Sequence, residues 1–187
     1  MVFREKHFYQ NPNVKIKKIS HKTIENKNKT ASAVFSYGGI MKVKVFNQSH
    51  HPLPSYKTAG SCGMDLQANL KEPMTLEPLD RVMVPTGLFF EIPEGVEGQV
   101  RARSGLSLKK GITTVNGIGT IDSDYRGELN VLLVNLSKES VTIEDGDRIA
   151  QIVFMRYETA QWEEVEEQSD LSKTDRGEGG FGHTGVR

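Results

Sequence analysis

The densest group of chemically reactive side chains lies in residues 122–127, where the sequence reads DSDYRG. Asp122 and Asp124 supply carboxylates, Tyr125 supplies a phenol ring and Arg126 a guanidinium group. A carboxylate held on a rigid turn can act as a general base toward water, and a nearby aromatic ring can pack against a sugar-like ligand. Polar turns are also common on protein surfaces without a catalytic role. The stretch alone therefore leaves a catalytic and a purely structural interpretation open.

Two apolar segments flank this polar stretch. Residues 118–121 alternate isoleucine with Gly and Thr, and residues 129–136 are rich in Val and Leu, a composition that favours strands. The Asp, Ser and Gly residues between them are typical of turns. We therefore predict a β-hairpin with residues 122–127 at its tip.

Other polar residues interrupt apolar or glycine-rich stretches elsewhere in the chain. Asp65 lies near the start of a predicted strand, just after Gly60 and Gly63. A short helix is predicted over residues 104–110; Arg103 precedes it and Ser104 is its first residue. Ser104 is expected to cap this helix, and the first turn would favour an anion. Gln151 interrupts an otherwise apolar strand. Each signal is weak by itself, because a cap, a core hydrogen bond or a structural acid would explain it equally well.

The C-terminal stretch from Asp175 to Gly185 cannot bury a core. It holds five glycines within residues 177–185, and ordering them costs much backbone entropy. A frayed tail is the plain interpretation. However, its Arg, Thr, aromatic ring and exposed backbone N–H groups would suit a phosphate-bearing aromatic ligand. An arm that becomes ordered over bound ligand is therefore the alternative.

The composition favours one all-β domain with tails. The chain has 187 residues, of which 36% are hydrophobic, and 18 are glycine, which indicates many turns and an open or oligomeric architecture. Short strand-like segments alternate with Pro- and Gly-containing turns, as in a β-sandwich or barrel. The predicted strands are residues 42–46, 63–69, 80–84, 87–92, 97–103, 112–115, 118–121, 129–136, 139–143, 148–156 and 161–167.

Charge is unevenly distributed along the chain. Residues 1–40 contain eight Lys or Arg and two Asp or Glu, whereas the whole chain is neutral, so the remainder is mildly acidic. An acidic body argues against general nucleic-acid binding. We predict a disordered leader or non-native start at residues 1–40, a barrel domain at 41–168 and a closing arm at 169–187. A basic nucleic-acid-binding arm is the alternative for the leader.

Cellular context follows from what the chain lacks. A single cysteine, Cys62, excludes an internal disulfide and favours a reducing compartment. The N-terminus has no apolar segment of the secretory type, and no apolar run reaches the roughly 20 residues that span a bilayer. We therefore expect a cytoplasmic protein that binds neither membrane nor nucleic acid.

Taken together and in this order, the five stretches closely resemble the motifs of the trimeric deoxyuridine triphosphate nucleotidohydrolases (dUTPases). The most specific are RSGL, GTIDSDYRGE and RGEGGFGHTG, and the match runs from about Met41 to Arg187. The resemblance implies an all-β, jelly-roll-like β-barrel with one short helix. It also implies a homotrimer whose active sites are each built from more than one subunit and closed by the C-terminal arm.

The resemblance further implies hydrolysis of dUTP to dUMP and pyrophosphate by attack of water on the α-phosphorus. Such an activity keeps uracil out of DNA and supplies dUMP for thymidylate synthesis. Asp122 would be the general base, and Tyr125 would pack under the deoxyribose and leave no room for a 2′-hydroxyl. Asn116 would read uracil with its amide. The backbone around it would supply the remaining contacts, from Gly119, Thr120 and Ile121.

Phosphate contacts are implied for two further groups of residues. The α- and β-phosphates would meet Arg103, Ser104, Gly105 and Gln151, with Ser104 and Gln151 acting in catalysis beside Asp122. The arm would clamp the γ-phosphate and cover uracil through Arg176, Phe181, Gly182, His183 and Thr184. Mg²⁺ is expected on the triphosphate, held on the protein side mostly through water, with Asp65 as an outer-sphere partner.

Departures from the family pattern are small. His183 stands where many relatives carry Ser, so its backbone is expected to matter more than its ring. Asp124 is expected to be structural, and the His50–His51 pair is expected to be solvated.

Two other functions remain open at this point. A dCTP deaminase, or a bifunctional dCTP deaminase/dUTPase, shares the fold but places a Glu base at the site. A non-catalytic trimeric nucleotide-binding regulator should have lost motif residues, and none is missing here.

Overall fold

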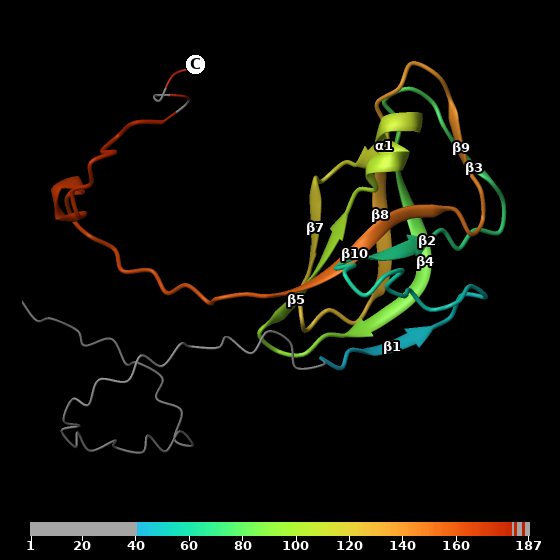
Figure 1. The fold of residues 1–187 in the computed structure, drawn as a ribbon, viewed down its shortest axis with the longest axis horizontal. Coiled ribbons are helices and arrows are strands. Elements are labelled where there is room, and N and C mark those ends of the chain that lie inside the picture. Colours follow the sequence, from blue (N-terminus) through green and yellow to red (C-terminus); the bar gives the residue numbers. More distant parts are fainter. Residues whose placement is uncertain (1–40, 181, 183–184, 186–187) are drawn as a thin grey trace, which may run out of the picture. The chain divides into compact units, whose positions relative to one another are not determined.

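The computed structural model describes residues 41–180, 182 and 185, so the leader predicted for residues 1–40 lies outside them. Within the described part the chain forms strands, one α-helix and one 3₁₀ helix (Figure 1). Their bounds are β1 Lys44–Asn47, β2 Met64–Gln67, β3 Met74–Leu76, β4 Arg81–Glu91, β5 Val96–Arg101, α1 Ser104–Lys110, β6 Ile112–Thr114, β7 Ile118–Ile121, β8 Glu128–Asn135, β9 Val141–Ile143, β10 Arg148–Arg156 and η1 Gln168–Asp170.

The strands form two four-stranded sheets and one two-stranded sheet. One large sheet has the order β1-β4-β8-β6, the other β2-β10-β5-β7, and β3 pairs with β9. All pairs are antiparallel. Figure 1 shows α1 at one end of the two large sheets, and the helix contacts β6. The expected all-β, jelly-roll-like barrel with one short helix is confirmed.

The core lies between the two large sheets, where each contributes alternate side chains. In β5, Val96, Gly98 and Val100 are buried and the residues between them are half-buried. This alternation is the period of a strand with one side facing the core. The same period places Leu133 of β8 in the core from the opposite sheet, where it is fully buried together with Leu66 and Ile152. Burying these side chains supplies the main favourable term for folding.

The predicted hairpin around residues 122–127 is wrong. β7 pairs with β5, whereas β8 pairs with β4 and β6, so the two strands belong to different sheets. Residues 122–127 are therefore a connection between sheets rather than a hairpin tip. Turn-forming residues show that the chain reverses, but not whether the strands they join share a sheet. Two packed sheets usually lie about 10 Å apart, and six residues of chain span that distance easily.

Three strand predictions also differ from the structure. The segments 80–84 and 87–92 form one strand, β4, which continues through Pro85 with a register shift between Pro85 and Phe89. A bulge is one of the places where a strand accepts proline. The short strand β3 was not predicted. Residues 161–167 form no strand; they are exposed and strongly acidic, and Trp162 is 95% exposed.

Asn135 joins three parts of the barrel although it is fully buried. Its Nδ2 donates to the carbonyl oxygens of Leu76 at 2.9 Å and Glu139 at 2.8 Å. Its Oδ1 accepts from the backbone N–H of Ser137 at 2.9 Å and from the Ser137 hydroxyl at 2.8 Å. One side chain of β8 thus satisfies polar groups of β3 and of the turn that follows β8.

Replacing Asn135 by Ala is expected to lower the free energy of unfolding by about 3 kcal/mol, because each buried polar group left unpaired costs about 1–3 kcal/mol. Asn130→Ala, on the same strand, is the matched control; Asn130 is half-buried and makes one 3.2 Å bond, to the Glu128 carbonyl. The control should lose less than about 1 kcal/mol. Urea unfolding at fixed protein concentration measures both, and equal losses would contradict this role of Asn135.

Candidate active site

Asp65, Arg103 and Arg148 form a compact ion-pair cluster on neighbouring elements. Asp65 lies on β2, Arg148 begins β10, and Arg103 immediately precedes α1. Arg103 Nε donates to Asp65 Oδ1 at 2.8 Å, and Arg148 Nη1 donates to Asp65 Oδ2 at 3.1 Å. Arg103 Nη1 also donates to the Arg148 carbonyl at 2.8 Å. One carboxylate therefore faces two guanidinium groups, and the cluster carries a net positive charge.

The first turn of α1 extends this positive cluster. Its first backbone N–H groups, including those of Ser104 and Gly105, have no intrahelical acceptor, as at any helix start. The expectation that Ser104 caps the helix is wrong: the cap position is Arg103, and no side-chain hydrogen bond closes the turn. A Cβ at Gly105 would meet nothing within 4 Å, so open space surrounds that position.

Gln151 of β10 is held between the two strands that pair with it. Its register partners are Asp65 on β2 and Arg101 on β5, and its Nε2 donates to the Ala102 carbonyl at 3.0 Å. Gly63 makes room for it, because a Cβ there would lie 2.4 Å from Gln151 Oε1. The structure therefore brings Asp65, Arg103 and Gln151 together, as a site for phosphate oxygens would require.

A second group is organised around β7, the edge strand of its sheet. Asn116 and Gly117 make the turn from β6, and Gly117 adopts a φ of 70°, which favours glycine. A Cβ at Gly119 would come within 3.1 Å of Asn116 Nδ2, so the amide lies directly beside that glycine. Within the described residues only β5 pairs with β7, so its outer edge offers free backbone groups.

Asp122 and Tyr125 follow β7 in the crossover between sheets. Both are exposed, Tyr125 by 45%. The Tyr125 hydroxyl donates to the Glu128 carbonyl at 3.0 Å, which folds the ring over Gly127. A Cβ at Gly127 would lie 2.6 Å from Tyr125 Cζ, so a glycine is required for this ring position.

Comparison with known proteins decides the family. The profile of the dUTPase family matches residues 48–185. The deoxyuridine 5′-triphosphate nucleotidohydrolase of Finegoldia magna is 56% identical over 145 residues, which cover 78% of this chain and 99% of that protein. That of Fusobacterium nucleatum is also 56% identical over 145 residues, covering 78% of this chain and 97% of that protein.

The chain belongs to the dUTPase family.

Solved dUTPase structures share the fold. A variant dUTPase of Staphylococcus bacteriophage 80alpha, solved with dUpNHpp, aligns with a TM-score of 0.69 at 28% identity and covers 78% of this chain and 99% of that chain. A variant dUTPase from phage phi11 of S. aureus, described with a structural Mg(II) ion, aligns with a TM-score of 0.61 at 25% identity, covering 67% and 97%.

In this dUTPase the two groups of site residues remain separate within one chain. No hydrogen bond or ion pair among the described residues joins Asn116, Asp122 or Tyr125 to the Asp65 cluster. Ile118 pairs with Arg101, and Ile121 pairs with Gly98, so the two ends of β7 lie at different distances from Arg103. Four residues at about 3.3 Å each separate Ile118 from Asp122, which places Asp122 toward the far end.

A hollow of about 740 Å³ borders Asp122, but it does not suit a triphosphate. Its lining carries four carboxylates, from Glu91, Glu94, Asp122 and Asp124, against the single guanidinium of Arg126. Like charges would repel a polyphosphate there. The charge of this hollow therefore disfavours a polyphosphate.

The described part of the C-terminal arm is mostly exposed, and its hydrogen bonds are local. Arg176 Nε donates to the Gly179 carbonyl at 2.8 Å, and residues 158–178 are all exposed. Three residues expected to contact substrate lie outside the described residues: Phe181, His183 and Thr184.

Sequence reasoning missed two features near the site. One is Arg148, the basic residue within the GDRIAQ stretch that also contains Gln151. The expectation that His50 and His51 are solvated is wrong for His51, whose side chain is only 14% exposed; both imidazoles contact Asp145. Among the described residues no helix is long and apolar enough to cross a membrane.

Proposed function

We propose that this chain hydrolyses dUTP to dUMP and pyrophosphate by attack of water on the α-phosphorus. The observation that carries the proposal is that two groups of residues occur together in a chain 56% identical to a named dUTP nucleotidohydrolase. One is an edge strand with Asn116 at its start and Asp122 after its end; the other is a positive cluster around Asp65. The first suits a base and a sugar, and the second suits phosphates.

Uracil is proposed to bind along the outer edge of β7. Its carbonyl and N–H groups need donors and acceptors in one plane, which the unpaired edge of β7 provides from alternate residues among Gly119, Thr120 and Ile121. The Asn116 amide offers one further acceptor and donors. Its closeness to Gly119 supports a shared role of the two residues in binding the base.

Tyr125 is proposed to pack its ring under the deoxyribose. The contact of the ring with Gly127 and the bond of its hydroxyl to Glu128 hold the ring in one position. A ribose 2′-hydroxyl against that face would lose its water without gaining a partner, which disfavours UTP.

Asp122 is proposed to be the general base that orients and deprotonates the attacking water. It is exposed, and none of the described hydrogen bonds or ion pairs occupies its carboxylate. Its oxygens are therefore free to accept a proton from water as the bond to phosphorus forms.

The positive cluster is proposed to stabilise the charge that develops on the phosphates. Arg103 would donate to phosphoryl oxygens, and the Ser104 hydroxyl with the Gly105 N–H would meet the α–β bridge, where leaving-group charge grows. Gln151 would bind the α-phosphate region. On the arm, Arg176 with Phe181, Gly182, His183 and Thr184 would close over the γ-phosphate and uracil.

Mg²⁺ is proposed to bind through water on the protein side. Each Asp65 oxygen already accepts a guanidinium N–H, at 2.8 Å and 3.1 Å, and keeps a second lone pair that can accept from a metal-bound water. This donor set fits an outer-sphere contact and not direct coordination. When bound, Mg²⁺ would neutralise triphosphate charge, which suits an ion that dehydrates reluctantly.

A homotrimer with shared sites is proposed as the working form. Among the described residues of one chain, no hydrogen bond or ion pair joins the β7 group to the Asp65 cluster, so another copy supplying the missing half would complete each site. The solved phage dUTPase with dUpNHpp supports a nucleotide as the ligand of this fold. The single cysteine supports a cytoplasmic location.

The test of the activity is pyrophosphate production from dUTP, dCTP, dTTP and UTP under identical conditions with Mg²⁺. Rapid release from dUTP alone is expected. Ammonia release from dCTP would instead favour a deaminase, and binding without any turnover would favour a regulator.

Replacing Gly127 by Ala is expected to weaken the discrimination between dUTP and UTP, because the added Cβ displaces the Tyr125 ring. The kcat/KM for dUTP divided by that for UTP should fall by about tenfold, since an extra or missing small group is worth about 1–3 kcal/mol. Gly60→Ala is the matched control, as a Cβ there meets nothing within 4 Å. An unchanged ratio in Gly127→Ala would refute the sugar-packing role.

A chain starting at Met41 is expected to hydrolyse dUTP at the full-length rate, because the proposed site uses only residues from Asp65 onward. Steady-state kinetics of the two proteins at equal trimer concentration measure this. Loss of activity would show that residues 1–40 belong to the enzyme.

A further inference from the structure

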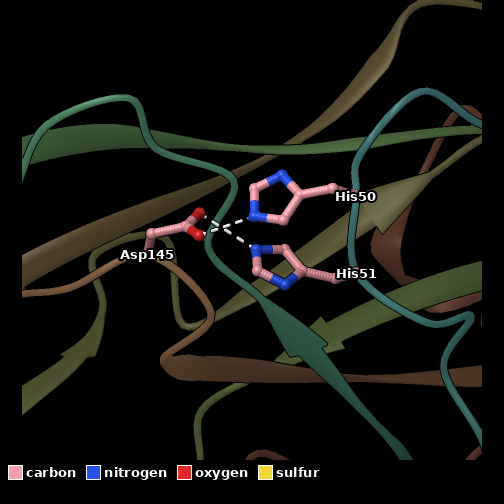
Figure 2. Close-up of side chains that lie close together, drawn as sticks. All are labelled: His50, His51 and Asp145. Carbon is pink, nitrogen blue, oxygen red and sulfur yellow. Dashed lines mark hydrogen bonds and ion pairs between the residues drawn. The ribbon is translucent and has the colours of Figure 1, made fainter.

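Two consecutive imidazoles and one carboxylate converge outside the proposed nucleotide site, as Figure 2 shows. His50 Nε2 lies 2.8 Å from Asp145 Oδ2, and His51 Nε2 lies 2.9 Å from Asp145 Oδ1. One ligand atom from each of the three residues lies within 4.8 Å of the others. We call these three residues the His–His–Asp cluster.

The backbone before the cluster is fixed by Asn47. Its Nδ2 donates to the His51 carbonyl at 2.8 Å, and its Oδ1 accepts from the Ser49 N–H at 3.0 Å. The His51 N–H in turn donates to the Ser49 hydroxyl at 3.2 Å. Consecutive side chains of a strand point to opposite faces, but this bend turns both rings the same way. Their centroids are 4.1 Å apart.

The carboxylate side of the cluster is equally well held. The Leu70 N–H donates to Asp145 Oδ1 at 2.9 Å, and the Gly146 N–H donates to the Ala68 carbonyl at 2.9 Å. Gly146 has a φ of 79°, and a Cβ there would lie 3.1 Å from His51 Cε1. The His51 imidazole, and then the Leu70 N–H, lower the pKa of Asp145 to about 2, so the carboxylate is anionic at neutral pH.

We propose that the His–His–Asp cluster binds a divalent transition-metal ion of the Zn²⁺ or Co²⁺ type. The Nε2 atoms of His50 and His51 and one or both oxygens of Asp145 are the protein ligands, and water completes the coordination. Imidazole nitrogen with carboxylate oxygen is a donor set that Zn²⁺ accepts, whereas Mg²⁺ prefers oxygen donors alone.

Ligand spacing is close to what such an ion needs. Zn–N and Zn–O distances near 2.1 Å in a tetrahedron put neighbouring ligand atoms about 3.4 Å apart. The present separations of 2.8 and 2.9 Å are hydrogen bonds, so the ion requires an opening of roughly half an ångström. The His50 side chain is 66% exposed and can move by that amount, and the ion can enter from its side.

Protons must leave the ion's position when it binds. In the metal-bound state each imidazole would carry its single N–H on Nδ1, which frees the Nε2 lone pair for the metal. The ion would then join the bend after β1 to the turn between β9 and β10. Because it binds only folded protein, it should raise the thermal unfolding midpoint.

The test is a Co²⁺ titration of full-length, chelator-treated protein in excess Mg²⁺, followed by the visible absorption of bound Co²⁺ and reversed by Zn²⁺. One equivalent per chain is expected. His50→Ala, His51→Ala and Asp145→Asn should each weaken binding by at least about 100-fold, the upper end of the loss seen for outer-shell partners. His21→Ala, which removes an imidazole outside the described residues, should bind as the wild type does.

Hydrolysis of dUTP in Mg²⁺ checks that each variant is folded, because the cluster is not part of the proposed nucleotide site. If His51→Ala does not fold, the other two variants decide the outcome. These are His50→Ala, at an exposed residue, and the near-isosteric Asp145→Asn. Equal Co²⁺ affinity in wild type and these variants would overturn the proposal. Binding lost only in His21→Ala would also overturn it.

Discussion

Asp122→Asn is expected to reduce kcat for dUTP by about 10³-fold or more while leaving nucleotide affinity nearly unchanged. General-base catalysis typically contributes about 10²–10⁴-fold, and an amide of the same shape cannot accept the proton of the attacking water. The backbone of β7, which is proposed to hold uracil, is untouched by the substitution. The largest effect should therefore appear in the chemical step and not in binding.

Single-turnover kinetics together with equilibrium binding of a non-hydrolysable dUTP analogue separate these two effects. Asp124→Asn is the matched control, because Asp124 is an exposed carboxylate on the same crossover with no proposed part in the chemistry. It should keep near-normal kcat. If Asp122→Asn still turns over dUTP while Asp124→Asn does not, the base has been assigned to the wrong carboxylate.

Ending the chain after Ser169 is expected to cut dUTP hydrolysis by about 10²-fold without lowering the unfolding midpoint. The arm residues up to 178 are exposed, and outside the arm their described hydrogen bonds reach only Glu167 and Gln168, which are themselves exposed, so the core loses nothing. Activity would fall because the triphosphate loses Arg176 and the cover that positions it, and misplacement by about 1 Å can cost 10²-fold.

Deleting only Val186 and Arg187 is the control for this truncation, since it keeps every arm residue with a proposed contact. Thermal unfolding and kcat/KM of both proteins should be measured side by side. A truncated protein with normal kcat/KM would rule out a closing arm. A large drop in its unfolding midpoint would show instead that the arm belongs to the structural core.

The parts of the fold that local chemistry determines were predictable from the sequence. The helix Ser104–Lys110 has its predicted bounds because Gly111, with a φ of 67°, ends it in a left-handed conformation. Strand β7 likewise has its predicted bounds. By contrast, strand pairing is a long-range property. Local sequence therefore predicts a hairpin where the chain crosses between sheets, and two strands, 80–84 and 87–92, where a bulge lets β4 continue past Pro85.

The candidate site shows the same division. Motif residues such as Asp65, Arg103 and Gln151 could be selected from the sequence, but their mutual contacts could not. The partnership of Arg148 with Asp65 depends on the pairing of β10 with β2, across 83 residues of chain. His50 and His51 contact Asp145 across 95 and 94 residues of chain, a pairing that local sequence does not indicate.

The most direct test of the central claim is hydrolysis of dUTP in water enriched in heavy oxygen, followed by mass spectrometry of both products. Attack on the α-phosphorus places the heavy oxygen in dUMP and leaves pyrophosphate unlabelled, and this is the expected result. Label in pyrophosphate, with unlabelled dUMP, would mean attack on the β-phosphorus. It would contradict the proposed alignment of Asp122, water and the innermost phosphate.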